Sequence, residues 1–225
     1  ACSVAAGPAF EGGGITSGMV ARTGAIDRFW LEDGKLNYNV IGGVKPEGIC
    51  GSGLIDLVHV LLETGLLDET GLIHAERYYG AWRDSEKGVE LVIVDGSKTE
   101  SGIPVVFNQE DVRRLQLAKA AVRAGVDILL QEAGIAPEDI GEVMFAGAFG
   151  NYLNPKAVLG TGMIPQFQPE AIKAIGNAAL RGAIAALLVI PEREKARQYA
   201  REIRAVELAD HPDVSRVFIA GMELK

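Results

Sequence analysis

The sequence predicts an α/β fold in which mixed sheets are flanked by helices, and three observations support this. A hairpin pattern covers residues 24–41, a long amphipathic helix pattern follows Asn108, and a short aliphatic strand pattern covers residues 143–146. Strand and helix signals therefore alternate along the 225 residues. A chain of this length suits one globular domain or one lobe of a larger protein.

The first quarter of the chain predicts a β-hairpin followed by a helix. Apolar residues alternate over residues 24–41, and the run Glu32-Asp33-Gly34-Lys35 supplies the turn. Ser52 is expected to head a helix that runs to about Glu63, because apolar positions recur there at helical spacing. Residues 66–88 are rich in turn formers and are left unassigned.

The middle of the chain predicts a strand and then a long helix. Residues 89–94 form an aliphatic strand pattern. Asn108 is expected to cap the helix, with Asp111 three residues later, and Gly134 is expected to end it after Ala133. The apolar stripe expected to be buried on this helix comprises Val112, Leu115, Ala118, Ala121, Val122, Val126 and Leu129.

The last third of the chain predicts one strand and then mainly helices. A buried strand is expected at residues 143–146, and helices are expected at about 170–189 and 192–204. On this reading Asn177 lies within a helix and bonds to a neighbouring helix, with contact to a bound ligand as the alternative, and Gly176 and Gly182 allow close helix packing. A short strand at 205–208 and a helical piece at 215–222 are expected to complete the chain.

Composition excludes several classes of function. A net charge of −8 argues against a surface for nucleic acid or anionic membranes. Two cysteines exclude a disulfide framework and any four-cysteine iron–sulfur site within this chain. The longest apolar run, residues 183–190, is too short to span a bilayer, and no signal peptide is visible. We therefore expect a cytoplasmic protein.

Glycine clusters are the main functional signal. The strand at 143–146 runs into Gly147-Ala148-Phe149-Gly150, and further clusters lie at residues 7–14, 48–53 and 176–179 among 28 glycines. A single strand-Gly-x-x-Gly signal favours a tight turn that lets a helix pack on a strand. Several clusters at element junctions favour a backbone-lined pocket for phosphate or nucleotide.

Four runs in this sequence resemble one protein family. They are ACSVAAGPAFEGGGITSG (1–18), GICGSGLIDLV (48–58), LQLAKAAVRAG (115–125) and AGAFGNYL (146–153). They are similar, in this order, to the C-terminal region of the reductive activators of corrinoid proteins. Those activators belong to the superfamily of acetate and sugar kinases, actin and heat-shock chaperone ATPases. The resemblance implies a ribonuclease H-like lobe of an actin/sugar-kinase ATPase.

The resemblance also implies where a nucleotide binds. Residues 146–151 match the adenosine motif of the family, and the start of the helix at Ser52 offers free N–H groups to phosphate. Ser52 as an ordinary helix cap is an equally supported alternative. The residues expected to bind the cofactor are Gly147, Ala148, Gly150, Asn151, Gly51, Ser52, Gly53, Gly7, Gly12 and Gly13.

Catalytic and metal-binding groups are not identified in this sequence. Mg²⁺ is expected to accompany ATP, and Glu11 is the acid set within a glycine cluster, although a capping or salt-bridged role explains it equally well. His59, His74 and His211 show no metal-ligand spacing. Cys50 reads as a small buried residue.

As a whole, the resemblance implies that residues 1–225 are the second nucleotide-binding lobe of a longer protein. That protein would use ATP to return a Co(II) corrinoid protein to Co(I), with electrons from an iron–sulfur domain outside this chain. The implied partners are a corrinoid iron–sulfur protein, or another corrinoid methyl-transfer protein, and a second copy in a homodimer. The lobe alone is expected to be inactive.

Two other functions remain open at this stage. One is a phosphotransferase lobe of the sugar- or acid-kinase type, and the other is a non-catalytic dimerisation or docking module. Tyr78, Tyr79, Trp82 and Arg83 cluster within the unassigned segment. Aromatic residues and arginine are enriched at interface hot spots, while the alternative for Trp82 is that it caps the core.

Overall fold

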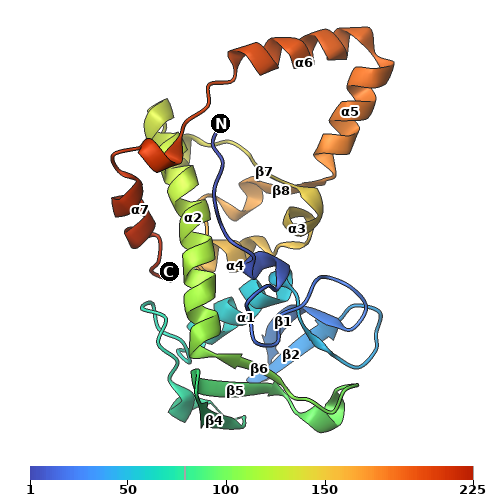
Figure 1. The fold of residues 1–225 in the computed structure, drawn as a ribbon, viewed down its shortest axis with the longest axis vertical. Coiled ribbons are helices and arrows are strands. Elements are labelled where there is room, and N and C mark those ends of the chain that lie inside the picture. The colour runs from blue at the N-terminus through green and yellow to red at the C-terminus, as the bar shows by residue number, and fades with distance from the viewer. Residues whose placement is uncertain (79, 225) are drawn as a thin grey trace.

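The computed structural model describes residues 1–78 and 80–224, which form an α/β fold of small sheets and flanking helices (Figure 1). The helices are α1 (Gly51–Glu63), α2 (Gln109–Ala133), α3 (Gly147–Tyr152), α4 (Pro155–Gly160), α5 (Ala178–Leu188), α6 (Ile190–Glu202) and α7 (Val214–Ala220). The strands are β1 (Ala25–Glu32), β2 (Lys35–Val40), β3 (Gly48–Ile49), β4 (Trp82–Ser85), β5 (Gly88–Val94), β6 (Val105–Asn108), β7 (Val143–Ala146) and β8 (Ile172–Gly176). Short 3-10 turns include η1 (Ala9–Glu11), η2 (Ala75–Arg77), η5 (Pro169–Ala171) and η6 (Leu208–Asp210).

The predicted hairpin and the helix after it are confirmed. Strands β1 and β2 pair antiparallel through a two-residue turn in which Asp33 and Gly34 both have positive φ, 51° and 71°. The first sheet has the order β2-β1-β3, and its β3 leads directly into α1. Helix α1 packs against β1 and α4, and its apolar side chains form the centre of the core.

The unassigned segment 66–88 contributes a bridge, a 3-10 turn and an edge strand. Leu67 pairs with Ile73, η2 follows, and β4 pairs with β5 at the edge of the sheet β4-β5-β6. Trp82 lies on this edge strand with 45% of its surface exposed. The expectation that Trp82 caps the core is therefore wrong. Tyr79, expected in the same cluster, lies outside the described residues.

Helix α2 has the predicted ends. The Asn108 side chain accepts from the Asp111 N–H at 3.0 Å, and the Asp111 carboxylate accepts from the Asn108 N–H at 3.1 Å. This reciprocal capping box starts the helix, and Gly134 ends it in the left-handed region at φ 64°. Leu129 was expected in the buried stripe but is half-exposed, and Ile128 is buried in its place because α7 packs on that side of α2.

The strand at 143–146 is confirmed, but its surroundings differ from expectation. It pairs in parallel with β8, so residues 172–176 are a strand and not the start of a helix. The short segment 172–175, in which Ile172 and Ile175 flank Lys173 and Ala174, forms this strand because β7 supplies its backbone partners. Strand β7 is half-exposed along its length, with Met144 57% exposed, and was wrongly expected to be buried.

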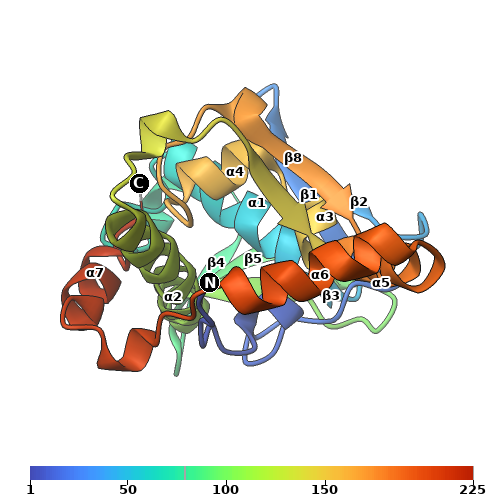
Figure 2. The same ribbon diagram turned by 90° about the horizontal axis from the view of Figure 1, so that it is seen from above.

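The last segment of the chain contains a second correction. Residues 205–208 form no strand, since they run as irregular backbone into η6. Val206 donates one backbone hydrogen bond to Ala1 O at 2.8 Å, and a single bond of this kind does not make a ladder. The terminal helical piece is confirmed as α7, which lies beside α2 (Figures 1 and 2).

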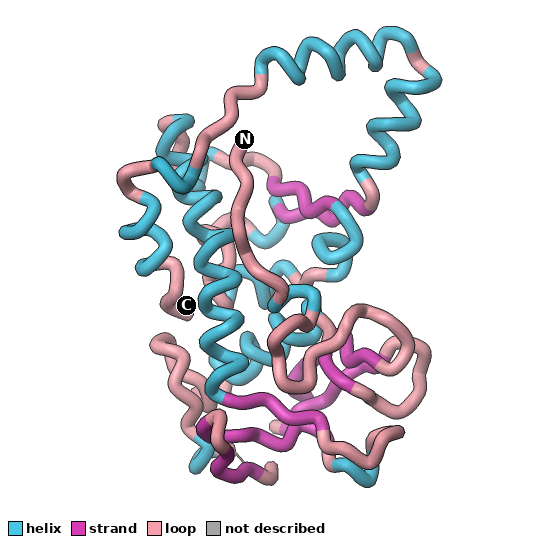
Figure 3. The backbone as a smooth tube through the Cα atoms, in the orientation of Figure 1, coloured by secondary structure: helices cyan, strands magenta, loops and turns pink. Residues whose placement is uncertain are grey.

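Helices α5 and α6 form an arm that extends from the body of the molecule and returns through residues 203–207 (Figures 1 and 3). Helix α5 packs mainly against α6 and has no buried residue. Arg193 fixes the corner between them by donating to Ala186 O at 2.8 Å and to Leu187 O at 2.9 Å. Within residues 1–78 and 80–224, no helix is both long and apolar enough to cross a bilayer.

Asp56 is a buried carboxylate on α1 with a pH-dependent effect on stability. One oxygen accepts from the Phe29 N–H at 3.3 Å and the other, Oδ1, has no hydrogen-bond partner among the described residues. Burial raises the pKa of Asp56 from 3.8 to about 6, against the opposing effect of the Phe29 hydrogen bond and of Arg28. The folded protein therefore holds this proton more tightly than the unfolded chain does.

We expect Asp56→Asn to flatten the pH dependence of stability between about pH 4 and pH 6. With a folded-state pKa above the unfolded value, Asp56 lowers stability as pH rises through this window, by up to about 3 kcal/mol above it. Urea unfolding at several pH values measures this difference between parent and variant. Asp68→Asn is the control of opposite sign, with its effect below about pH 4, because hydrogen bonds from Thr70 and Leu72 hold the pKa of Asp68 well below its usual range. Parallel pH profiles for Asp56→Asn and the parent would contradict the assignment.

Candidate functional site

The parallel strands β7 and β8 end side by side on two glycines. Ala146 is paired with Gly176 in the strand register, and Gly147 follows directly with φ 84°. A side chain is rarely tolerated at this φ, so glycine is required here by conformation. No atom lies within 4 Å of the position that a Cβ on Gly147 would take, so the backbone faces open space. Ligands of α/β proteins bind beyond such carboxyl ends of strands.

Helix α3 connects this strand edge with a cavity through its two faces. Asn151 lies near β8, since its Oδ1 would be 3.8 Å from a Cβ on Gly176. Gly147 and Asn151, four residues apart, thus lie on the face of α3 toward the strand edge. Ala148 and Tyr152, also four residues apart, lie on the neighbouring face and line the cavity together with Phe149. Residues four apart share one face of a helix, so the two pairs point in different directions. The predicted adenosine motif, residues 146–151, is therefore divided between two adjoining surfaces, the edge of strands β7 and β8 and the cavity.

This cavity, which we name cavity A, has a volume of about 770 Å³ and lies between η1, the β1–β2 hairpin, the N-terminus of α1, and α3. It is lined by Phe10, Glu11, Met19, Val20, Ala21, Asp27, Asn39, Val40, Ile41, Gly42, Gly43, Cys50, Gly51, Ser52, Ala148, Phe149 and Tyr152. The rings of Phe10 and Phe149 stack with centroids 5.2 Å apart. Its size falls in the range of small-molecule sites, roughly 300–1,000 Å³.

The polar groups of cavity A come from the hairpin and from the start of α1. Ser52 Oγ donates to Asp27 O at 3.0 Å, and Asn39 Nδ2 donates to Asp27 Oδ1 at 2.7 Å. Ser52 therefore does not cap α1; the N-cap position is Cys50, which makes no side-chain capping bond. The first N–H groups of a helix have no partner within the helix, so those of Gly51 and Ser52 can bind an anion. Cys50 is buried, as expected.

Four of the predicted glycines are explained by close packing. A Cβ on Gly51 would lie 1.9 Å from Phe10 O, and a Cβ on Gly53 would lie 2.4 Å from Ile26 O. Gly12 and Gly13 are similarly close, at 2.4 Å from Met19 N and 2.7 Å from Pro8 Cβ. Gly51 and Gly53 bring η1 and β1 against α1, whereas Gly12 and Gly13 let the chain after η1 pack against Met19 and Pro8. Of the four, only Gly51 also lines cavity A.

The remaining predicted positions do not face cavity A. Gly7 is exposed on the segment before η1, and Gly150 is buried against Phe145. Asn177 is the N-cap of α5, and its side chain accepts from the Leu180 N–H at 3.0 Å. This side chain therefore caps its own helix and does not bond to a neighbouring helix. Gly182 has no atom near its Cβ position, so it does not serve close helix packing.

The segment between η1 and Met19, both of which line cavity A, is anchored to the start of α2 and to β6. The Thr16 N–H donates to Asp111 Oδ1 at 2.7 Å, and Asn108 Nδ2 donates to Thr16 Oγ1 at 2.7 Å. Ser17 Oγ accepts from the Val106 N–H at 2.9 Å. Burial raises the pKa of Asp111, although the hydrogen bonds from Thr16 and Asn108 oppose this shift. The capping box of α2 thus also positions the segment that lies between η1 and β1.

The sequence did not reveal the hairpin side of the site or the role of β8. Asp27 and Asn39 sit on paired strands and meet only through the register of the hairpin. The signal that could have located β8 is weak, because its sequence Ile-Lys-Ala-Ile-Gly has two isoleucines and ends on glycine but is interrupted by Lys173. Among the described residues, no group of three or more His, Cys, Asp and Glu side chains is placed to hold a metal ion.

Parallel strands ending on glycine turns, next to a cavity at a helix N-terminus, define the chain as an α/β lobe of the nucleotide-binding kind. Comparison with known proteins gives the family. The model described as the C-terminal domain of RACo, the ASKHA domain, matches residues 1–225. The chain belongs to this family, and the resemblance noted in the sequence is confirmed.

Curated relatives and a solved structure agree with this assignment. The chain is 36% identical over 217 residues to the "Corrinoid activation enzyme RamQ" of Eubacterium limosum, covering 93% of this chain and 37% of that protein. It is 30% identical over 232 residues to the "[Co(II) methylated amine-specific corrinoid protein] reductase" of Methanosarcina barkeri, covering 93% and 38%. The structure of a "Reductive activator for corrinoid,iron-sulfur protein" matches with a TM-score of 0.90 and 36% identity, covering 99% of this chain and 36% of that chain. The chain therefore spans little more than a third of the length of these relatives.

Proposed function

We propose that this chain is the second nucleotide-binding lobe of an ATP-dependent reductive activator, which returns a corrinoid protein from Co(II) to Co(I). Its similarity over 93% of its length to a corrinoid activation enzyme carries the proposal. One electron is needed for each cobalt reduced, and we assign its supply to an iron–sulfur domain outside these residues. The two cysteines, both free thiols, suit a reducing cytoplasm, where we place the protein.

The residues at the two adjoining surfaces fit a nucleotide. Cavity A offers aromatic and aliphatic walls with a few polar groups, and Gly147 leaves its backbone open to a ligand. We assign the nucleoside to the strand edge at Gly147 and Asn151 and to the adjoining wall of cavity A at Ala148. Gly150, which is buried against Phe145, supports this site by packing. We assign the phosphates to the N-terminus of α1 at Gly51 and Ser52. The site is supported indirectly by four other glycines. Close packing requires glycine at Gly53, Gly12 and Gly13, and a positive φ favours it at Gly7.

Bound ATP would supply the free energy that drives a change between two conformations of the activator and its corrinoid partner. Mg²⁺ would enter with the phosphates, and the carboxylates of Glu11 and Asp27 line the cavity that we assign to them. The contribution of this lobe is to form one wall of the nucleotide cleft. Activity is expected to need the rest of the longer protein.

The direct test is the reduction of a Co(II) corrinoid protein by the longer protein, with and without ATP. We expect the visible spectrum to change to that of Co(I) only when ATP and a low-potential electron donor are both present. Phosphorylation of a sugar or small acid in place of this change would favour the kinase alternative. A protein that associates with partners but neither binds ATP nor supports reduction would favour the docking alternative.

We further propose that the α5–α6 arm forms the interface of a homodimer. Arg181 is the charged residue within α5, and Leu180, Leu187 and Leu188 are 55%, 71% and 74% exposed. A helix that is apolar and exposed along its length marks an association surface. In a twofold dimer the same patch meets itself, which suits a surface with little net charge.

We expect Leu187→Glu to weaken self-association at least tenfold, or about 1.4 kcal/mol, without lowering the melting temperature. The glutamate would place an unpaired charge in the centre of the apolar patch. Sedimentation over a concentration series measures the association. The control is Leu117→Glu, at a leucine that is 49% exposed on α2, away from the arm. Equal weakening by both variants, or a monomeric parent protein, would contradict the assignment.

A further inference from the structure

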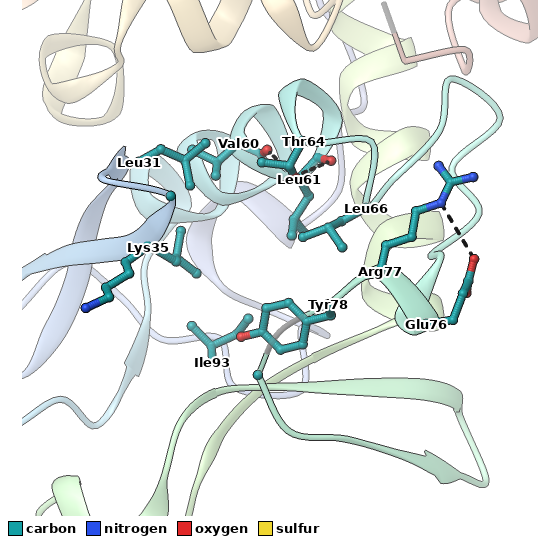
Figure 4. A pocket seen from close by; sticks show the side chains of 13 residues that line it. Leu31, Lys35, Val60, Leu61, Thr64, Leu66, Glu76, Arg77, Tyr78 and Ile93 are labelled. Carbon is teal, nitrogen blue, oxygen red and sulfur yellow. Dashed lines mark hydrogen bonds and ion pairs between the residues drawn. The ribbon is translucent and has the colours of Figure 1, made fainter.

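A second cavity, which we name cavity B, lies at the C-terminal end of α1, whereas cavity A lies at its N-terminal end. It has a volume of about 650 Å³. Its walls are aliphatic and come from the tip of the β1–β2 hairpin, the end of α1, and β5 (Figure 4). The side chains that form these walls are Leu31, Leu36, Val60, Leu61, Leu66 and Ile93.

Three polar side chains that line cavity B are already bonded within the protein. Tyr78 OH donates to Val92 O at 3.1 Å, and Thr64 Oγ1 donates to Val60 O at 2.9 Å. Arg77 donates to Gly65 O at 3.1 Å. A sugar or a nucleotide base would bury its own polar groups here without partners, and each such loss is costly. The cavity therefore suits a hydrocarbon body.

The charged side chains that line cavity B are two cations, Lys35 and Arg77, and one carboxylate, Glu76. Lys35, the first residue of β2 and the cross-strand neighbour of Glu32, makes no ion pair within the part of the chain that the structure describes. The guanidinium of Arg77 is partly balanced by Glu76 at 3.7 Å. Figure 4 shows Lys35 and Arg77 on opposite sides of the aliphatic side chains, with the cationic end of each directed outward from them. The ammonium of Lys35 stands on a flexible four-carbon chain, so it can reach an anionic group at the mouth of cavity B.

We propose that cavity B binds a small amphipathic monoanion, of the class of medium-chain carboxylates, with its hydrocarbon chain among the leucines and its carboxylate at Lys35. Helix α1 and the β1–β2 hairpin form walls of both cavities, so a ligand in cavity B contacts the two elements that also shape cavity A. Cavity B shares no lining residue with cavity A. Binding there is therefore independent of whether the proposed nucleotide function is correct.

Calorimetry with decanoate and with decanol, below the concentration at which decanoate forms micelles, tests the proposal on this chain. We expect both to bind, and decanoate to bind more tightly. Lys35→Glu should weaken decanoate binding by about fivefold at low salt and leave decanol unchanged. Lys98→Glu, at an exposed lysine outside the cavity, should change neither. Absence of decanoate binding, or equal effects of the two lysine variants, would overturn the proposal.

Filling the cavity provides the second test. Leu31 is 38% exposed at the mouth of cavity B, so Leu31→Trp is expected to fold normally. Val60 is buried, so Val60→Trp would overpack the core and is not used. Leu31→Trp should weaken binding of decanoate and decanol alike, by about tenfold. Leu72→Trp, at an exposed leucine that does not line the cavity, is the matched control. Unchanged binding in a folded Leu31→Trp protein would show that the ligand lies elsewhere.

Discussion

Gly51→Ala is expected to destabilise the fold by about 3 kcal/mol, which is the upper end of the usual cost of overpacking. The new Cβ would lie 1.9 Å from Phe10 O and 2.9 Å from a ring carbon of Phe149. The first contact is with backbone, so η1 or α1 must move as a whole. Thermal and urea unfolding of the 225-residue chain measure the loss.

Gly182→Ala is the matched control for this effect. Gly182 lies inside α5, and no atom lies within 4 Å of its Cβ position. Alanine there should stabilise α5 by roughly 0.5–1 kcal/mol, because glycine is the poorer helix former. If Gly51→Ala unfolds at the same denaturant concentration as the parent, close packing of η1 on α1 is not what requires glycine at this position.

Ala148→Trp is expected to weaken nucleotide binding at least tenfold in the longer protein proposed above. Ala148 is exposed and lines cavity A, so the indole would occupy space that we assign to the nucleotide without disturbing the core. Calorimetry with ATP and Mg²⁺ measures the affinity, and the melting temperature should stay close to that of the parent. Reduction of the corrinoid protein should fall with nucleotide occupancy.

Two further variants make this experiment specific. Ala133→Trp places the same side chain on an exposed alanine at the end of α2 and should bind nucleotide normally. Asn151→Ala tests the second surface, beside β8, without filling cavity A. Normal ATP affinity in Ala148→Trp together with a loss in Asn151→Ala would place the nucleotide at the strand edge alone. Normal affinity in both would refute the assignment of the site to α3.

Most of the fold could be predicted where the signal is local. The turn at Asp33-Gly34 and the capping box of Asn108 and Asp111 need only residues a few positions apart, and both were found. Strand β8 was missed because its few aliphatic residues also suit a helix, and only pairing with β7 decides between them. The exposure of β7 and Trp82 depends on what covers each strand, which a local pattern does not contain.

The candidate site was predictable in outline but not in the roles of its residues. The glycine clusters at residues 48–53 and 146–151 do lie close together in the structure. The sequence could not separate Gly51, whose Cβ position is occupied, from Gly147, whose Cβ position is empty. That distinction rests on contacts with Phe10 and Phe149, which are far apart in the sequence. The Asp27–Asn39 pair was missed because neither residue stands near a glycine cluster.

The α5–α6 arm also has a consequence for hydrogen exchange. Its amides are bonded within the two helices, but the arm packs mainly on itself, so it can open without unfolding α1 or α2. Deuterium should therefore label residues 178–202 of the free chain much faster than the core helices. If labelling of this segment alone slows when a second copy or a corrinoid protein is added, the partner that causes the change is the one that covers the arm.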